Sequence, residues 1–131
     1  MTRYALLGVA IWAAATIALR IAGQAVFEHP VALFAVSLVA MVTLAVLALP
    51  NGDAGVRAAI ALATPGMLLD TISAIAFARV FPNIRADAAG LFGGWLLFCN
   101  AVVLLAALAL RGEEGDSERR PPARVPPSRS G

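Results

Sequence analysis

One carboxylate stands out as a candidate for chemistry, because Asp70 lies inside an otherwise apolar segment, T-P-G-M-L-L-D-T-I-S. A charged side chain at the centre of a lipid bilayer costs about 2.5–3.5 kcal/mol, so it is expected to face protein or water. At about 100° per residue, Asp70 shares one helix face with Gly66 and Ser73, and branched aliphatic residues lie opposite. The pattern predicts that Asp70 points into a helix bundle, where it could carry a proton or form an ion pair.

The first apolar segment offers a partner for Asp70, since a polar residue recurs there at every fourth position from Thr16 to Glu28. Counted back from the prolines that follow the two segments, Arg20 and Asp70 differ in depth by only ~3 Å at about 1.5 Å per residue. A guanidinium at this depth has donors for several acceptors at once. We therefore predict a buried polar cluster that also includes an amide from the fourth segment: Arg20, Gln24, Asp70 and Asn100.

Two further groups of residues have predicted structural roles. Pro65 removes a backbone donor and Gly66 beside it eases bending, so a helix kink is predicted at this point. The segment G-L-F-G-G-W contains a G-x-x-x-G spacing, which allows two membrane helices to approach closely. Its glycines are therefore predicted to pack against another helix: Gly90, Gly93 and Gly94.

Patterns typical of catalysis do not occur in this sequence. There is no nucleophile–base arrangement, no metal-binding spacing and no glycine-rich phosphate loop after a strand. The single cysteine, Cys99, lies within an apolar segment, and the single histidine, His29, lies at the edge of one. We therefore expect no enzyme, no cofactor, no metal site and no nucleic-acid partner.

The elements that position these side chains must suit a membrane, because the chain is 60% apolar and 14% charged, with a mean hydropathy of +0.84. A spanning helix needs about 20 mostly apolar residues, and four such stretches alternate with short turns. We predict an all-α polytopic membrane protein, an up-down bundle of four transmembrane helices in which consecutive helices pack as antiparallel neighbours. The predicted spans cover residues 4–27, 31–49, 57–81 and 88–110.

The orientation of the chain in the membrane is predicted from its arginines alone, since it contains no lysine. Arg3, Arg57 and Arg111 fall at one end of the bundle, together with the arginines of the C-terminal tail. The positive-inside rule then places both termini in the cytoplasm, in a bacterial inner (plasma) membrane. The competing interpretation of the first span is a cleaved signal peptide, but Arg20 interrupts the region where cleavage would occur.

The C-terminal segment differs in composition from the rest. Residues 1–111 form the predicted transmembrane domain, and residues 112–131 form a predicted disordered cytoplasmic tail, because this segment has too little apolar area to fold alone. An acidic block is followed there by R-R-P-P-A-R-V-P-P. The alternative is that this basic, proline-rich stretch binds a partner as a polyproline ligand or contacts anionic lipid.

Several segments resemble those of a known family: I-W-A-A-A-T-I-A-L-R-I-A-G-Q, T-P-G-M-L-L-D-T, F-A-R-V-F-P-N and A-A-G-L-F-G-G-W-L-L. The family is one of small bacterial four-span membrane proteins known as a domain of unknown function, and the similarity covers about residues 6–108. It implies a membrane fold without an activity. Small multidrug transporters are similar in size only, because their membrane-embedded acid is a glutamate in the first span, where this chain has Arg20.

Two classes of function follow from these residues. In the first, the bundle is an interaction or assembly subunit, as a homodimer or with another membrane protein, and the Arg20–Asp70 cluster fixes helix register. In the second, a dimer transports a small solute or a proton, with Asp70 as the titrating group. The sequence favours the first class, because an acid neutralised by arginine is a poor proton carrier.

Overall fold

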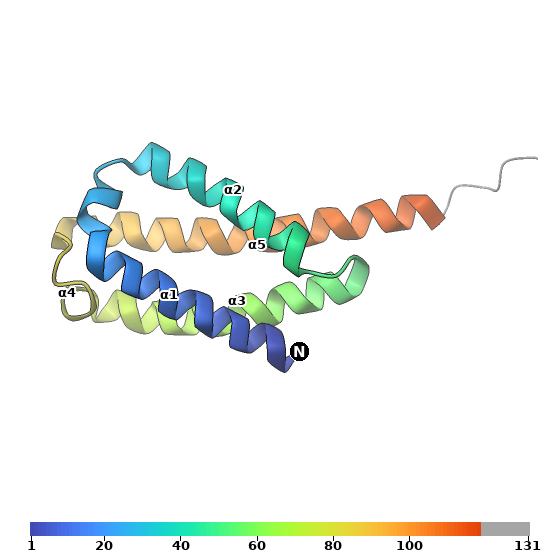
Figure 1. Cartoon of the computed structure of the whole chain (residues 1–131), viewed down its shortest axis with the longest axis horizontal. Helices are drawn as coiled ribbons and strands as arrows, with labels where there is room; N and C mark the ends of the chain where they lie inside the picture. The colour runs from blue at the N-terminus through green and yellow to red at the C-terminus, as the bar shows by residue number, and fades with distance from the viewer. Residues whose placement is uncertain (119–131) are drawn as a thin grey trace, which may run out of the picture.

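The computed structural model describes residues 1–118, with side chains for residues 1–112, and within that range it is helical with no strand (Figure 1). Four long helices are joined by short connections, the last of which holds a short helix and a 3-10 turn. The elements are α1 (Thr2–Phe27), α2 (Pro30–Ala48), α3 (Gly52–Ile75), α4 (Phe77–Val80), η1 (Ala86–Ala88) and α5 (Ala89–Glu118).

The ends of the helices follow from proline and glycine. Pro30 is the first residue of α2, where its missing N–H costs nothing and its fixed φ suits a helix. Gly52 opens α3 with a φ of 68°, a left-handed conformation that favours glycine. A Cβ on Gly55 would lie 2.0 Å from the carbonyl oxygen of Pro50, so this turn is tight. The third span consequently begins five residues before its predicted start.

The end of the third span also differs from the prediction. α3 ends at Ile75, and Ala76 has non-helical angles (φ −96°, ψ 23°) before the four residues of α4. After this break Phe77 and Phe81 turn inward and are buried, with ring centroids 5.3 and 5.0 Å from that of Phe92. The polypeptide therefore closes one end of the bundle where a continuous helix was predicted.

The last helix is longer than the predicted span. α5 continues to Glu118, eight residues beyond the predicted end at Leu110. The segment predicted to be disordered from residue 112 therefore begins inside α5. The proline-rich stretch at residues 119–127 lies outside the described residues.

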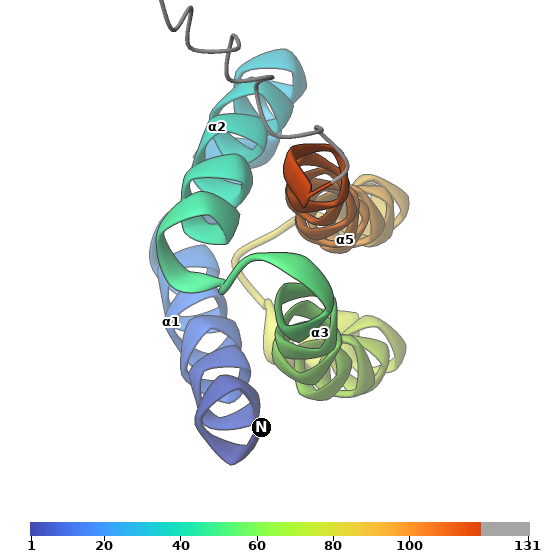
Figure 2. The same cartoon turned by 90° about the vertical axis from the view of Figure 1, so that its right-hand side faces the viewer.

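The prediction of an all-α bundle is confirmed, and four helices are long and apolar enough to cross a membrane. They alternate in direction, as Figure 1 shows. The prediction that consecutive helices are packed neighbours is wrong for α2, because it packs mainly on α5, while α1 packs on α3 and α3 on α5 (Figure 2). A short turn fixes only where two helix ends meet, so α1 and α2 diverge with few contacts.

Two apolar clusters hold the ends of the bundle. The alanine-rich cluster lies at the end that contains the N-terminus and consists of Tyr4, Ala45, Leu49, Ala58, Ala59, Leu62, Val103 and Ala107. The aromatic cluster lies at the opposite end and consists of Leu19, Phe27, Phe77, Phe81, Ile84 and Phe92.

Glycine permits the closest helix contact, but at a position other than those predicted. A Cβ on Gly8 of α1 would lie 2.0 Å from the carbonyl oxygen of Leu62, so the backbones of α1 and α3 touch at this point. Around Gly90, Gly93 and Gly94 an added Cβ would meet nothing within 4 Å. Within this one chain, the three glycines therefore make no close helix contact, and their predicted role in helix packing stays a prediction.

Candidate functional site

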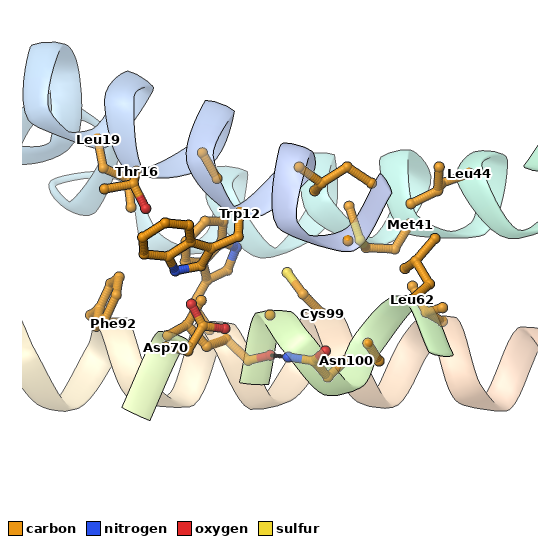
Figure 3. Close-up of a pocket in the computed structure, with 18 of the residues that line it drawn as sticks. Trp12, Thr16, Leu19, Met41, Leu44, Leu62, Asp70, Phe92, Cys99 and Asn100 are labelled. Atoms are coloured by element: carbon orange, nitrogen blue, oxygen red, sulfur yellow. Dashed lines mark hydrogen bonds between the residues drawn. The ribbon is translucent and has the colours of Figure 1, made fainter. Parts of the chain in front are cut away.

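A cavity of about 140 Å³ lies between the two clusters and is lined by α1, α2, α3 and α5 together with Phe81 (Figure 3). Apolar side chains such as Ile11, Met41 and Leu62 form most of its wall. A minority of the lining residues can form hydrogen bonds through their side chains. These are Trp12 and Thr16 of α1, Asp70 of α3, and Trp95, Cys99 and Asn100 of α5.

Asp70 is the one charged residue among those that line this cavity, and it is half-buried. Its carboxylate faces the indole of Trp12 (Figure 3). Among the side chains of residues 1–112, the ion pairs are Arg85–Asp87 at 2.5 Å and Arg111–Asp53 at 2.6 Å, so none involves Asp70. The Asp70 side chain points into the bundle, as predicted. Its predicted ion pair with Arg20 is not present.

Arg20 does not reach Asp70, because it lies on the wrong face of α1. The inward face of α1 contains Gly8, Leu19 and Gly23, and Arg20 is exposed one residue beyond Leu19. Seven residues, about two turns, separate Arg20 from the helix end at Phe27, which lets its side chain extend toward the membrane surface.

The predicted match in depth also fails, since it assumed that α3 continues to Pro82. Gly8 lies against Leu62, and α1 runs parallel to α3. Eight residues further along each helix stand Thr16 and Asp70, so Asp70 is level with Thr16 and about one turn from Arg20.

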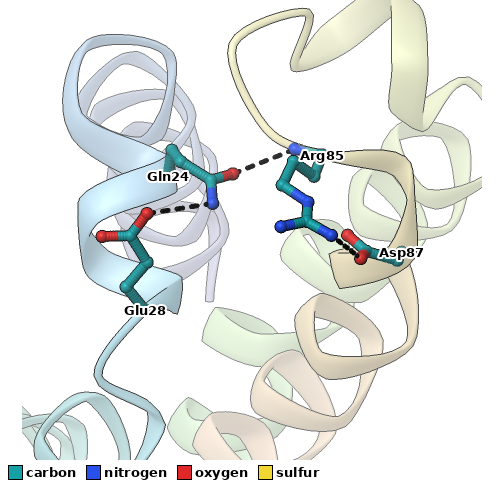
Figure 4. A network of polar contacts seen from close by, with 4 residues as sticks. All are labelled: Gln24, Glu28, Arg85 and Asp87. Carbon is teal, nitrogen blue, oxygen red and sulfur yellow. Dashed lines mark hydrogen bonds and ion pairs between the residues drawn. The ribbon is translucent and has the colours of Figure 1, made fainter.

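Gln24 belongs to a different polar site at the aromatic end of the bundle (Figure 4). Its Oε1 accepts a hydrogen bond from the backbone N–H of Arg85 at 3.0 Å, and its Nε2 donates to Glu28 at 3.3 Å. Arg85 in turn pairs with Asp87 at 2.5 Å. The predicted cluster is therefore divided, with Gln24 in this exposed network.

Asn100 is the predicted residue that does share a cavity with Asp70. Its Nδ2 donates a hydrogen bond to the carbonyl oxygen of Leu96 at 2.9 Å, one turn earlier in α5. No hydrogen bond to its Oδ1 occurs within the part of the chain that the structure describes. Of the four residues in the predicted polar cluster, only Asp70 and Asn100 line the same cavity.

Pro65 and Gly66 lie inside α3 close to the cavity, and Gly66 lines it. The helix continues through both residues, and the hydroxyl of Thr64 donates to the carbonyl oxygen of Ile60 at 2.7 Å. An added Cβ on Gly66 would meet nothing within 4 Å. The predicted kink stays a prediction.

Tryptophan is the residue type that sequence reasoning missed. Trp95 donates from Nε1 to the hydroxyl of Ser37 at 2.7 Å, which joins α5 to α2 beside the cavity. The buried Nε1 of Trp12 makes no direct hydrogen bond with the side chains described, residues 1–112, although its indole faces the Asp70 carboxylate (Figure 3). The signal for Trp12 was available, since it falls at intervals of four between Gly8 and Thr16 on the inward face of α1.

The lining residues of this cavity allow a proton or a cation to bind reversibly to the carboxylate of Asp70. Within the side chains of residues 1–112, no three from His, Cys, Asp or Glu are grouped so that they could hold a metal ion. Asp70 can bind a proton or a positively charged group in surroundings that contain no competing cation of the protein.

Comparison with known proteins gives one match. The model of a family of unknown function, DUF5367, matches residues 21–114, a range that includes Asp70 and Asn100. No curated protein and no solved structure matches the chain. The resemblance inferred from the sequence agrees with this match, although the matched range begins after Trp12 and Thr16.

Proposed function

This chain belongs to the family of unknown function DUF5367, and we propose that it is a membrane transport protein in which Asp70 binds and releases a proton or a small solute. The observation that carries the proposal is the position of Asp70. It is the one charged residue lining a cavity between four helices that are long and apolar enough to span a membrane.

The energetics of a lone acid favour a functional role. A charge at mid-membrane costs about 2.5–3.5 kcal/mol, and the structural role predicted for Asp70, fixing helix register, relied on an ion pair with Arg20. Arg20 is exposed, and none of the ion pairs formed by the described side chains, residues 1–112, includes Asp70. The objection that arginine would neutralise the acid is thereby removed, and proton binding becomes the better explanation for an aspartate here.

The experiment is proton flux into liposomes that contain the purified full-length protein. Vesicles with an internal pH dye, an imposed pH gradient and valinomycin for charge balance report proton entry. We expect flux with the wild type and its loss in Asp70→Asn, with Asp87→Asn as the matched control because Asp87 is exposed and outside the cavity. Equal flux in wild type and Asp70→Asn, after subtraction of empty vesicles, would rule the proposal out.

A second candidate function is membrane assembly, as a homodimer or with another membrane protein. A shallow groove between α2 and α5 supports it, because a row of apolar and partly small side chains is open there: Leu38, Val42, Val46, Val102, Leu105, Ala106, Ala109 and Leu110. Lipid tails would also cover this groove. Cross-linking of single cysteines at Val42 and Leu105 in membranes separates these cases, with dimer bands expected only for assembly.

We further propose that both termini face the cytoplasm, as for a protein of a bacterial inner membrane. Arg3, Arg57 and Arg111 are exposed at one end of the bundle, which the positive-inside rule assigns to the cytoplasm. Reporters fused after Asp53 or Asp116 should behave as cytoplasmic, and one fused after Asn83 as external. A reporter at residue 116 active only outside would overturn this orientation.

A further inference from the structure

The cavity around Asp70 combines one negative charge with aromatic walls. Trp12, Phe81, Phe92 and Trp95 all line it, and its remaining wall is mostly aliphatic. Aromatic faces attract cations through their quadrupole, and the attraction grows when water is excluded. The two features of the cavity therefore favour the same kind of ligand, one with a positive charge on an apolar body.

Other ligand classes fit the same walls poorly. An anion would place a second negative charge beside Asp70, with no basic side chain in the lining to offset it. A divalent metal ion requires six or more oxygen ligands, or several retained waters, and only Thr16, Asp70 and Asn100 bring side-chain oxygens into the lining. A neutral apolar molecule would bury the carboxylate without compensating its charge.

The size of the cavity limits the ligand to a small molecule. A volume of about 140 Å³ is close to that of engineered protein cavities that bind benzene. A primary ammonium group on a ring or branched chain of about six carbons has this size. The ammonium donates to Asp70, and the hydrocarbon part lies against the aromatic rings.

We infer that the cavity binds a small organic cation, a protonated amine with an apolar body, between Asp70 and the indoles of Trp12 and Trp95. This inference rests on the proposed function, because it names the class of solute that Asp70 would exchange for a proton. It adds that Asp70 recognises charge, whereas the aromatic rings recognise the apolar part.

The chain supplies its own reporter for the test. It has two tryptophans, and both line the cavity. Emission of the detergent-solubilised full-length protein is titrated with cyclohexylammonium and with its neutral isostere, cyclohexanol. We expect a saturable change with cyclohexylammonium and binding of cyclohexanol that is weaker by about tenfold or more, the usual value of a charge-assisted hydrogen bond.

Variants then assign the binding to the carboxylate. Asp70→Asn should weaken cyclohexylammonium binding by about tenfold or more and leave cyclohexanol unaffected, whereas Asp87→Asn should bind both as the wild type does. Should Asp70→Asn fail to fold by circular dichroism, the comparison of the two probes on the wild type still decides. Equal affinities for the charged and neutral probes, or no saturable change, would overturn the inference.

The liposome flux assay and the binding titration together test transport and cation binding separately. Asp70-dependent proton flux without selective cyclohexylammonium binding would retain transport and reject an organic cation as the ligand. Selective binding without any flux would retain the cation site and reject transport.

Discussion

The two ends of the bundle are both apolar, yet they are held together in different ways. At the alanine-rich end, small side chains let the backbones of α1 and α3 touch at Gly8 and Leu62. At the aromatic end, large rings fill the space, and Phe92 makes ring contacts with Phe27, Phe77, Phe81 and Trp95. A backbone contact cannot adjust to a larger side chain, whereas rings can change rotamer.

Polar contacts are present at both ends. At the alanine-rich end, Arg111 of α5 pairs with Asp53 of α3 at 2.6 Å. The connection between α3 and α5 is attached to α1 by two hydrogen bonds, from Asn83 Nδ2 to the carbonyl oxygen of Leu19 at 2.8 Å and from the backbone N–H of Arg85 to Gln24 at 3.0 Å. Each contributes about 1 kcal/mol. Because the aromatic end is held by side-chain rings and these two bonds, whereas helix backbones touch at the alanine-rich end, we expect the aromatic end to open first and a solute to reach the cavity from there.

The largest effect is expected at the alanine-rich end, from Gly8→Ala. The new Cβ would lie 2.0 Å from the carbonyl oxygen of Leu62, so α1 and α3 must separate, at a cost of about 3 kcal/mol. Thermal melting in one detergent, followed by circular dichroism, measures the change.

Gly93→Ala is the matched control for this change. Nothing lies within 4 Å of a Cβ added there, and alanine favours a helix over glycine by about 1 kcal/mol. We expect an unchanged or slightly raised melting temperature. A similar fall in both variants would show that the contact between Gly8 and Leu62 is not special.

A smaller loss is expected at the aromatic end from Phe92→Ala. The ring is 2% exposed and contacts four other rings. In lipid only the packing contribution is lost, so we expect about 2 kcal/mol, below the range for soluble cores. Phe98→Ala is the comparison, since Phe98 is half-buried and forms one ring contact, with Phe34. Equal losses in the two variants would argue against an aromatic cluster that acts as a unit.

The smallest effect on stability is expected from Asn83→Ala, which removes the hydrogen bond to Leu19 and costs about 1 kcal/mol. Hydrogen exchange should quicken in the connection at residues 76–88 and stay unchanged at the start of α3. Asn51→Ala is the control, because the side chain of Asn51 forms no capping hydrogen bond. Faster exchange at both ends would contradict the view that the aromatic end opens separately.

The sequence alone predicted the four spans well, because hydrophobic length is a strong signal in a membrane protein. It did not predict which face of α1 points inward. Polarity suggested the stripe that includes Arg20, whereas the buried face follows Tyr4, Gly8 and Gly23. A long arginine side chain can reach the membrane surface from the lipid side, so polarity alone did not identify the interior.

The site was predictable in part. Asp70 and Asn100 were singled out because polar groups in apolar helices are costly, and both line the cavity. The aromatic walls were not predicted, since Phe81 and Phe92 meet only after α3 breaks at Ala76. No local signal in the sequence marks that break, which depends on contacts between distant segments.

The most direct test of the account is to measure stability and proton flux on one preparation of Asp70→Asn. A carboxylate kept for function adds a cost to the fold, so its neutral isostere should melt at the same temperature as the wild type or higher. We predict this unchanged or raised melting temperature together with the loss of proton flux in liposomes. A large fall in melting temperature with flux at the wild-type level would contradict it, because Asp70 would then serve the fold and not transport.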